Sequence, residues 1–235
     1  MPVSLAALKK MVRSEADPAK AVVLKGFFKT GKGDYGEGDR FMGLTVPISR
    51  RIANKFAALR VVDIQKLLTS SIHEERLIAL LMMVERFDKG NEKVKRDIYT
   101  LYIASTTRIN NWDLVDLSAD KIVGRYLFNH SRQKLFTLAR SKNIWERRIA
   151  IIATFYFIKQ NDFETTVAII KLLLNDRHDL IHKSMGWMLR EIGKRSSPVL
   201  RQFLNEYKEI LPRTTVRYAI ERFPEKERKK YLARS

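Results

Sequence analysis

Apolar residues recur every three or four positions along most of the chain, the spacing that places them on one face of an α-helix. No convincing alternation of polar and apolar residues, the pattern of a half-buried strand, interrupts this spacing. The sequence therefore predicts an all-α protein. The expected helices cover residues 3–15, 17–29, 47–59, 62–70, 72–88, 91–105, 112–127, 131–140, 144–160, 163–174, 179–194, 197–208, 213–222 and 225–233.

Prolines mark several of these helix starts. Pro18, Pro47, Pro198 and Pro224 each lie at or near the first residue of an expected helix. The N–H that proline lacks has no partner in the first turn of a helix, so proline is tolerated there and supports the boundary.

One irregular region, TGKGDYGEGDRFMGL (30–44), holds half of the ten glycines. Its Gly31, Gly33 and Gly36 imitate the glycine spacing of a dinucleotide-binding fingerprint, which requires a strand before it and a helix start after it. Here a predicted helix precedes the glycines. We expect a surface loop, with a loop that reaches over a cleft as the alternative.

Segments that open with polar and basic residues and continue into an apolar run recur along the chain. They are EERLIALLMMVERF (74–87), ERRIAIIATFYFIK (146–159) and IHKSMGWMLREIGK (181–194). Arg148 and Lys183 are 35 positions apart, and Arg76 precedes Arg148 by about two such periods. This period is typical of α-solenoids built from stacked helix pairs. We therefore expect a single domain over residues 1–235, curved, with a concave surface rich in Lys and Arg.

Charge narrows the class of partner. The chain carries 45 Lys+Arg against 26 Asp+Glu, a formal net charge of +19. Such an excess indicates a nucleic acid, an anionic membrane or an acidic protein as partner.

Several kinds of site and location are excluded or disfavoured. The absence of cysteine excludes disulfides, thiol catalysis, cysteine–zinc sites and iron–sulfur clusters. No apolar stretch approaches the roughly 20 residues that cross a bilayer, and the start, MPVSLAALKK, lacks the basic region and cleavage site of a secretion signal. We expect a cytoplasmic protein with no membrane partner. His178 and His182 have metal-ligand spacing, but surface or capping positions are the default, and we expect no metal.

Two helices carry aromatic and basic residues in unusual places. Around Trp187, the apolar stripe of Ile181, Met185, Met188, Leu189 and Ile192 leaves the tryptophan on the opposite, basic side. A core position is the default for tryptophan, but this pattern favours a ligand-facing one. On the expected helix 144–160, we assign Trp145 to the core. Arg148 lies in an apolar arc of the same helix, and its charge needs an anion there. That anion is a carboxylate in a structural salt bridge, or a phosphate or nearby carboxylate that the arginine clamps, and the two functions can coexist.

The segment NNWDLVD (110–116) places carboxylates beside an aromatic in a basic protein. Trp112 and Asp116 share a helix face, together with Val123 and, near Asp116, Leu127. Asp113 and Asp120 point to one side, and we expect them to be solvated. The default readings are core for Trp112 and a surface carboxylate for Asp116, and neither explains their adjacency.

A carboxylate in a polyanion-binding groove weakens binding, so its presence is explained if a cation forms there. Hydrolysis of an N-glycosidic bond creates one, because the sugar becomes oxocarbenium-like as the base departs. A fixed carboxylate stabilises that charge or orients the attacking water. No second acid accompanies Asp116, which suits a leaving base that is already cationic, such as a ring-alkylated purine.

The residues discussed above also carry a family likeness. The chain resembles the AlkD family of alkylpurine DNA glycosylases over most of its length. The segments that carry the resemblance are DPAKAVVLKGFFKTG (17–31), DYGEGDRFMGL (34–44), VPISRRIA (46–53), NNWDLVD (110–116), NIWERRIAIIATFYFIK (143–159) and KSMGWMLREIGK (183–194).

This resemblance implies HEAT-like repeats around a basic concave surface. It implies excision of cationic N3- and N7-alkylated purines from double-stranded DNA, without metal or cofactor and without flipping of the base. Asp116 matches the catalytic aspartate, Arg148 the cleft arginine, and Trp112 and Trp187 the aromatics beside the lesion nucleotide's backbone. Phe27 stands where a tyrosine can occur in the family, so a hydroxyl function is in doubt there.

Further DNA contacts are expected from basic residues near these positions, namely Arg76, Lys183, Arg190 and Lys194. We expect the protein to act as a monomer. Two alternatives remain open: a helical module that binds nucleic acid without chemistry, and a protein–protein scaffold whose acidic partner would have to balance the charge of +19.

Overall fold

The computed structural model of the chain describes residues 3–233. The first two residues of the MPVSLAALKK segment and the last two residues of the chain therefore lie outside the described residues. Within 3–233 the regular elements are helices, and the only β-type pairing is an isolated bridge between Arg40 and Ile72. The prediction of an all-α fold is confirmed.

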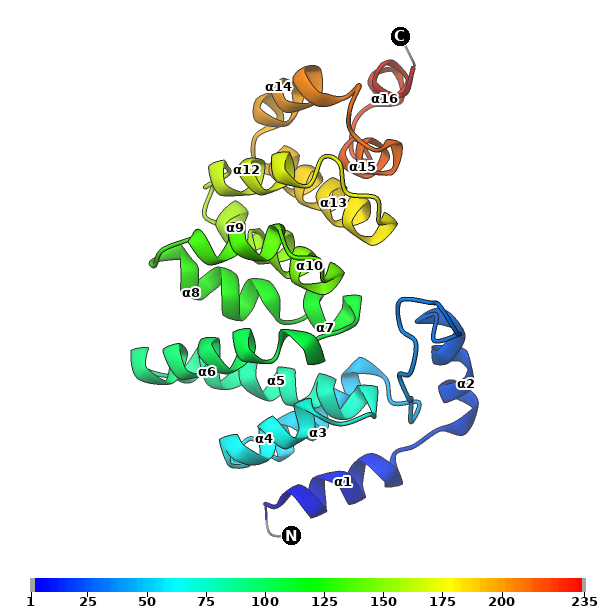
Figure 1. Cartoon of the computed structure of the whole chain (residues 1–235), viewed down its shortest axis with the longest axis vertical. Coiled ribbons are helices and arrows are strands. Elements are labelled where there is room, and N and C mark those ends of the chain that lie inside the picture. The colour runs from blue at the N-terminus through cyan, green and yellow to red at the C-terminus, as the bar shows by residue number, and fades with distance from the viewer. Residues whose placement is uncertain (1–2, 234–235) are drawn as a thin grey trace. The chain divides into compact units, whose positions relative to one another are not determined.

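The chain divides into two compact units, an N-terminal unit of residues 1–118 and a C-terminal unit of residues 119–235 (Figure 1). The N-terminal unit contains α1 (Leu5–Ser14), α2 (Pro18–Phe27), α3 (Val46–Lys55), α4 (Val61–Leu68), α5 (His73–Lys89), α6 (Glu92–Ala104), the 3-10 turn η1 (Thr106–Arg108) and α7 (Trp112–Asp116). The C-terminal unit contains the π-helical turn η2 (Asp120–Gly124), α8 (Arg125–Phe128), α9 (Gln133–Ala139), α10 (Ile144–Ala153), α11 (Phe155–Lys159), α12 (Glu164–Leu172), α13 (Asp179–Arg195), α14 (Ser197–Tyr207), α15 (Arg213–Ala219) and α16 (Glu225–Leu232).

Each unit is built around helices that the sequence singled out as repeats. In the N-terminal unit, α5 packs against α3, α4, α6 and α7. In the C-terminal unit, α10 packs against α9, η2 and α13, and α13 packs in turn against α14 and α15 (Figure 1). Neighbours along the chain are thus neighbours in space, as in a helical repeat array. The single domain and the curvature over the whole chain stay predictions.

The four prolines lie where the sequence predicted. Pro18 is the first residue of α2, Pro47 and Pro198 are the second residues of α3 and α14, and Pro224 is the N-cap of α16. The start of α2 is also capped by Asp17, whose side chain accepts a hydrogen bond from the amide of Lys20 at 3.0 Å.

The expected helix over 112–127 is wrong, because the chain breaks it into α7, η2 and α8. The Ser118 hydroxyl donates to the Leu114 carbonyl at 2.5 Å and lies just beyond the end of α7. A serine that bonds to the preceding turn competes with the regular helix and bends it. Thr154, whose hydroxyl donates to Ile151 at 2.7 Å, marks the break between α10 and α11 in the expected helix 144–160. Val123 and Leu127 consequently belong to other helices than Trp112 and Asp116.

Gly43, near the end of the glycine-containing loop, packs against the backbone at the start of α2. Its φ is +88°, and an added Cβ would lie 2.1 Å from the carbonyl oxygen of Asp17. Gly33 in the same loop has a similar φ of +82° but open space around the Cβ position. Alanine at Gly33 would meet only the strain of a positive φ, whereas alanine at Gly43 would also meet a steric clash. Comparing the two substitutions therefore separates the free-energy costs of strain and clash.

We expect Gly43→Ala to lower the free energy of unfolding by about 2–4 kcal/mol, from the strained φ together with the overpacking. Gly33→Ala meets only the first cost and should lose about 1–2 kcal/mol. Urea unfolding of the two variants and the parent measures both values. Equal losses in the two variants would show that the contact with Asp17 does not constrain the loop.

Candidate functional site

The five-residue helix α7 carries the residues that the sequence singled out in NNWDLVD. The N-cap is Asn111, whose side-chain oxygen accepts from the amide of Trp112 at 2.8 Å. Trp112 and Asp116, the two ends of the helix, are both half-buried. A helix this short has little stability of its own, so contacts with the rest of the N-terminal unit hold it in place.

Asp113 and Asp120 are buried, and the expectation that they are solvated is wrong. Asp113 is 6% exposed and its Oδ2 lies 2.8 Å from Nε2 of His73. Asp120 is 3% exposed and accepts from Lys159 at 2.6 Å. The expectation assumed one long helix with a single polar side, whereas the short α7 packs against α5 through the side that carries Asp113.

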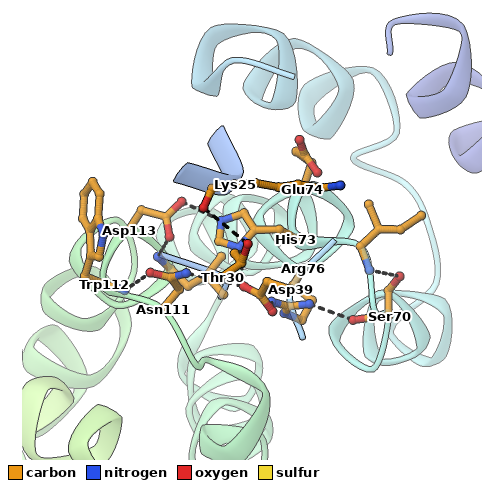
Figure 2. A network of polar contacts seen from close by, with 12 residues as sticks. Lys25, Thr30, Asp39, Ser70, His73, Glu74, Arg76, Asn111, Trp112 and Asp113 are labelled. Carbon is orange, nitrogen blue, oxygen red and sulfur yellow. Dashed lines mark hydrogen bonds and ion pairs between the residues drawn. The ribbon is translucent and has the colours of Figure 1, made fainter. Parts of the chain in front are cut away.

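Asp113 belongs to a group of buried polar side chains that we call the His73 cluster: Asp39, His73, Arg76, Asn111 and Asp113. Nδ1 of His73 lies 3.0 Å from Oδ2 of Asp39. The other Asp39 oxygen accepts from Nη2 of Arg76 at 2.6 Å, and Asn111 donates to Asp39 at 3.4 Å. The cluster therefore joins the glycine-containing loop, the start of α5 and α7 (Figure 2).

His73 holds a positive charge inside the protein. Burial alone would lower the pKa of its imidazole, but the charge of Asp113 and the hydrogen bonds to Asp113 and Asp39 outweigh burial and raise the pKa to about 9. Each ring nitrogen thus donates to a carboxylate. Burial likewise works to raise the pKa of Asp39, but the hydrogen bond from His73 and the charges of Arg76 and His73 bring it below its usual value.

Glu74 holds the loop from the same end of α5. Its carboxylate accepts from the backbone amides of Met42, Gly43 and Leu44 at 3.0, 2.8 and 3.1 Å. The loop before residue 39 is mostly exposed, and α2 rather than a strand precedes it. The surface-loop expectation holds for this outer part, whereas Asp39, Phe41, Gly43 and Leu44 are buried in the unit.

A mainly apolar pocket of about 400 Å³ opens beside these groups in the N-terminal unit. Aromatic and aliphatic side chains from α2, the loop, α3, α5 and α7 line it together with acidic groups and one imidazole. The lining residues are Leu24, Phe27, Phe28, Phe41, Leu44, Thr45, Val46, His73, Glu74, Leu77, Trp112, Asp113, Asp116 and Leu117.

An aromatic stack runs from the cluster to Trp112. The ring of Phe41 stacks on His73 with centroids 4.5 Å apart, Phe28 stacks on Phe41 at 5.1 Å, and Trp112 stacks on Phe28 at 5.1 Å. Phe27, which is 61% exposed, meets Trp112 edge-on at 5.6 Å. The packed ring of Phe28 therefore sets the plane of Trp112, and the exposed ring of Phe27 lies beside it.

The predicted site residues of the N-terminal unit do not all share one environment. Phe27, Trp112 and Asp116 line the pocket together. Arg76, expected to contact DNA, is 3% exposed and bonds to Asp39 and to the Ser70 carbonyl. Its guanidinium anchors the loop, and a phosphate could reach it only if it left these partners.

The other predicted residues belong to the C-terminal unit. Arg148 is 5% exposed and donates to the Leu180 carbonyl, and Trp145 is buried in the core as predicted. Trp187 is half-buried, apart from the fully buried stripe of α13, and its indole N–H donates to Glu191 at 3.2 Å.

The basic residues around Trp187 have acidic partners. Lys183 pairs with Asp179, Lys194 with Glu191, and Arg190 with Glu221. A polyanion that binds here must therefore compete with these carboxylates for the basic side chains. It would meet no such competition at a surface of unpaired lysines and arginines.

The two candidate metal ligands have other partners. Nδ1 of His178 accepts from the amide of Leu180 and caps α13, and Nε2 of His182 donates to the Asp176 carbonyl at 2.6 Å. Within 3–233, no group of three or more His, Asp or Glu side chains is arranged to hold a metal ion. Over the same residues, no helix has the length and apolarity to cross a membrane.

The sequence pattern of the DNA alkylation repair enzyme family matches residues 8–223, nearly the whole chain. The protein belongs to this family. Family membership supports a function in DNA repair and the positive charge agrees with a DNA partner.

A solved structure supports the fold assignment. It is described as a predicted DNA alkylation repair enzyme from Enterococcus faecalis, and it superimposes with a TM-score of 0.70 at 15% sequence identity. The match covers 90% of this chain and 98% of the other. None of the curated protein sequences matches this chain.

The His73 cluster makes stability depend on pH in a defined direction. Because the pKa of His73 is raised from 6.5 to about 9 by folding, its contribution is complete below pH 6.5, declines as the pH rises and is lost above about 9. We expect the free energy of unfolding to decrease over this window in the parent and to lose this component in His73→Gln. Urea unfolding across the window measures the difference.

His130→Gln is the matched control, because His130 is exposed and stacks on Tyr126 in the other unit. It should keep the pH dependence of the parent. An identical pH dependence in the parent and His73→Gln would contradict a buried imidazolium.

Proposed function

We propose that the protein is a monofunctional DNA glycosylase that hydrolyses the N-glycosidic bond of cationic N3-alkylated adenine and N7-alkylated guanine in duplex DNA. The observation that carries this proposal is Asp116, half-buried on α7 and lining an apolar pocket beside Trp112, in a basic member of the DNA alkylation repair enzyme family. The cytoplasmic location and the monomeric state remain predictions.

The chemistry follows from where charge develops. The bond from C1′ of deoxyribose to the base nitrogen breaks, and its electron pair leaves with the base, which becomes neutral. A carboxylate about 4 Å from the resulting oxocarbenium-like sugar contributes on the order of 4 kcal/mol at an effective dielectric constant near 20. This is roughly a thousandfold in rate. Water then adds to C1′ and loses a proton, and Asp116 orients that water.

A cationic leaving base removes the need for a general acid. His73 lines the same pocket and is protonated, but both of its ring nitrogens already donate to carboxylates. His73 therefore cannot donate a proton to the base without losing a hydrogen bond to Asp39 or Asp113. This supports a substrate whose base departs without protonation, which is the class of ring-alkylated purines.

The remaining residues contact the nucleotide around the lesion in this proposal. Trp112 and Trp187 pack on the deoxyribose backbone, and the base stays in the helix rather than entering a pocket. Arg148 is 5% exposed and donates to the Leu180 carbonyl, so it holds a phosphate only after its guanidinium turns outward. Phe27 offers an exposed ring beside Trp112, and Lys183, Arg190 and Lys194 supply positive charge. Water is the second substrate and no cofactor is required.

We expect Asp116→Asn to reduce single-turnover release of 3-methyladenine or 7-methylguanine from methylated duplex DNA roughly a thousandfold. DNA affinity should be kept or improved, because a charge that repels phosphate is removed. Asp97→Asn is the control, since it neutralises a carboxylate with 60% of its side chain exposed on α6, away from the pocket.

The parent protein decides between the proposal and its alternative. No base release by the parent, with normal DNA affinity, would favour the non-catalytic nucleic-acid-binding module. Release by Asp116→Asn at the parental rate would keep the enzyme and reject Asp116 as its catalytic carboxylate.

We further expect the affinity for undamaged duplex DNA to fall steeply with salt, roughly a thousandfold or more between about 50 and 200 mM for a footprint of several phosphates. Titration of a labelled duplex at several salt concentrations measures the slope. A flat dependence would instead favour the protein–protein scaffold, because contacts with DNA phosphates release counterions.

A further inference from the structure

The His73 cluster holds the start of α7, the helix that carries Trp112 and Asp116, in two ways. Asp113, next to Trp112 and one turn before Asp116, accepts from Nε2 of His73 at 2.8 Å. The N-cap Asn111 donates to Asp39, which accepts from the other ring nitrogen of His73. Both hydrogen-bond routes from α7 thus converge on one imidazole (Figure 2).

The aromatic stack supplies a further connection. Phe41 lies on the face of His73 with ring planes 24° apart, and Phe28 lies between Phe41 and Trp112. A cation against an aromatic face is attractive, about 0.5–2 kcal/mol depending on desolvation. The stacked rings therefore connect His73 to Trp112 by a second path, in addition to the hydrogen bonds to α7.

We propose that the His73 imidazolium is a positioning residue, which fixes Trp112 and Asp116 through α7 and switches the enzyme off when it loses its proton. The proposal rests on the glycosylase function proposed above. His73 is 2% exposed and both of its ring nitrogens are bonded to carboxylates, so we assign it a positioning function rather than a catalytic one.

Deprotonation changes the cluster in two respects. One ring nitrogen becomes an acceptor that faces a carboxylate oxygen, so one hydrogen bond turns into a repulsion. The charges that face His73 are Asp39 from the loop, Arg76 from α5 and Asp113 from α7, with Glu74 and Asp116 in the same pocket. Without the imidazolium, a single arginine remains to balance the two cluster aspartates, and α7 is held more weakly, by one His73 hydrogen bond fewer and by the bond from Asn111 to Asp39.

Three variants, His73→Gln, Asp113→Asn and His130→Gln, test this arrangement. Glutamine offers one donor group but cannot donate at both of the opposite positions that Asp39 and Asp113 occupy. Asp113→Asn keeps the size of the side chain and removes the charge that raises the pKa of His73. His130→Gln removes an exposed imidazole in the other unit and serves as the control.

The test is the pH profile of single-turnover base release, corrected at each pH for base loss without enzyme. In the parent, we expect a plateau that falls above about pH 9, with about a tenfold loss one pH unit beyond that point. Asp113→Asn should move this alkaline fall to lower pH. His73→Gln should be slow at all pH values and lack the fall, and His130→Gln should match the parent.

A purely structural function of His73 predicts something else. His73→Gln would then lower the melting temperature and the rate but keep the parental alkaline fall, and Asp113→Asn would leave its position unchanged. Either result overturns the proposal, as does a parental rate that stays constant above pH 9.

A second measurement is independent of activity. The indole N–H of Trp112, assigned with Trp112→Phe among three tryptophans, and the ring protons of His73 should shift together in NMR spectra, around pH 9. A neutral His73 at neutral pH overturns the proposal, and so does a Trp112 signal that does not change as His73 titrates. Absence of base release with this coupled shift present would instead reject the proposed glycosylase function and keep the coupling.

Discussion

A protonated imidazole held between two carboxylates is the interaction on which the candidate site depends. His73 connects Asp39, in a loop with little regular structure, to Asp113, in a helix of five residues. Neither segment has enough internal hydrogen bonding or length to fix its own position. Their common attachment to the start of α5, the most buried helix of the N-terminal unit, gives both a defined place.

Burying this many ionised groups is unfavourable unless their charges are matched. The cluster meets this condition, since the cations His73 and Arg76 face the anions Asp39 and Asp113. Asn111 supplies another donor, and the loop amides satisfy Glu74. Removing one member leaves a buried charge without its partner, which is why single substitutions are expected to affect the loop and α7 together.

The sequence predicted the helices well and the polar cluster not at all. Helical spacing, proline positions and the core assignment of Trp145 depend on residues close in sequence, and such patterns survive folding. The partners of His73 are 34 and 40 positions away, so no local pattern reveals them. One signal was present: His73, Glu74 and Arg76 open a helix that then becomes apolar, and titratable groups at a buried helix start require partners.

The buried position of Asp113, which the sequence prediction missed, explains why NNWDLVD carries two aspartates in a basic protein. Read on a long helix, Asp113 points to solvent, but the break near Ser118 leaves a short helix that packs against α5. Its first aspartate is then matched by a cation inside the protein, while its last lines the pocket. In the function proposed above, one carboxylate positions the other. If the protein binds DNA as proposed, phosphate repulsion acts to push Asp116 away, so a negative group can lie where a sugar becomes positive only if the protein keeps it in position.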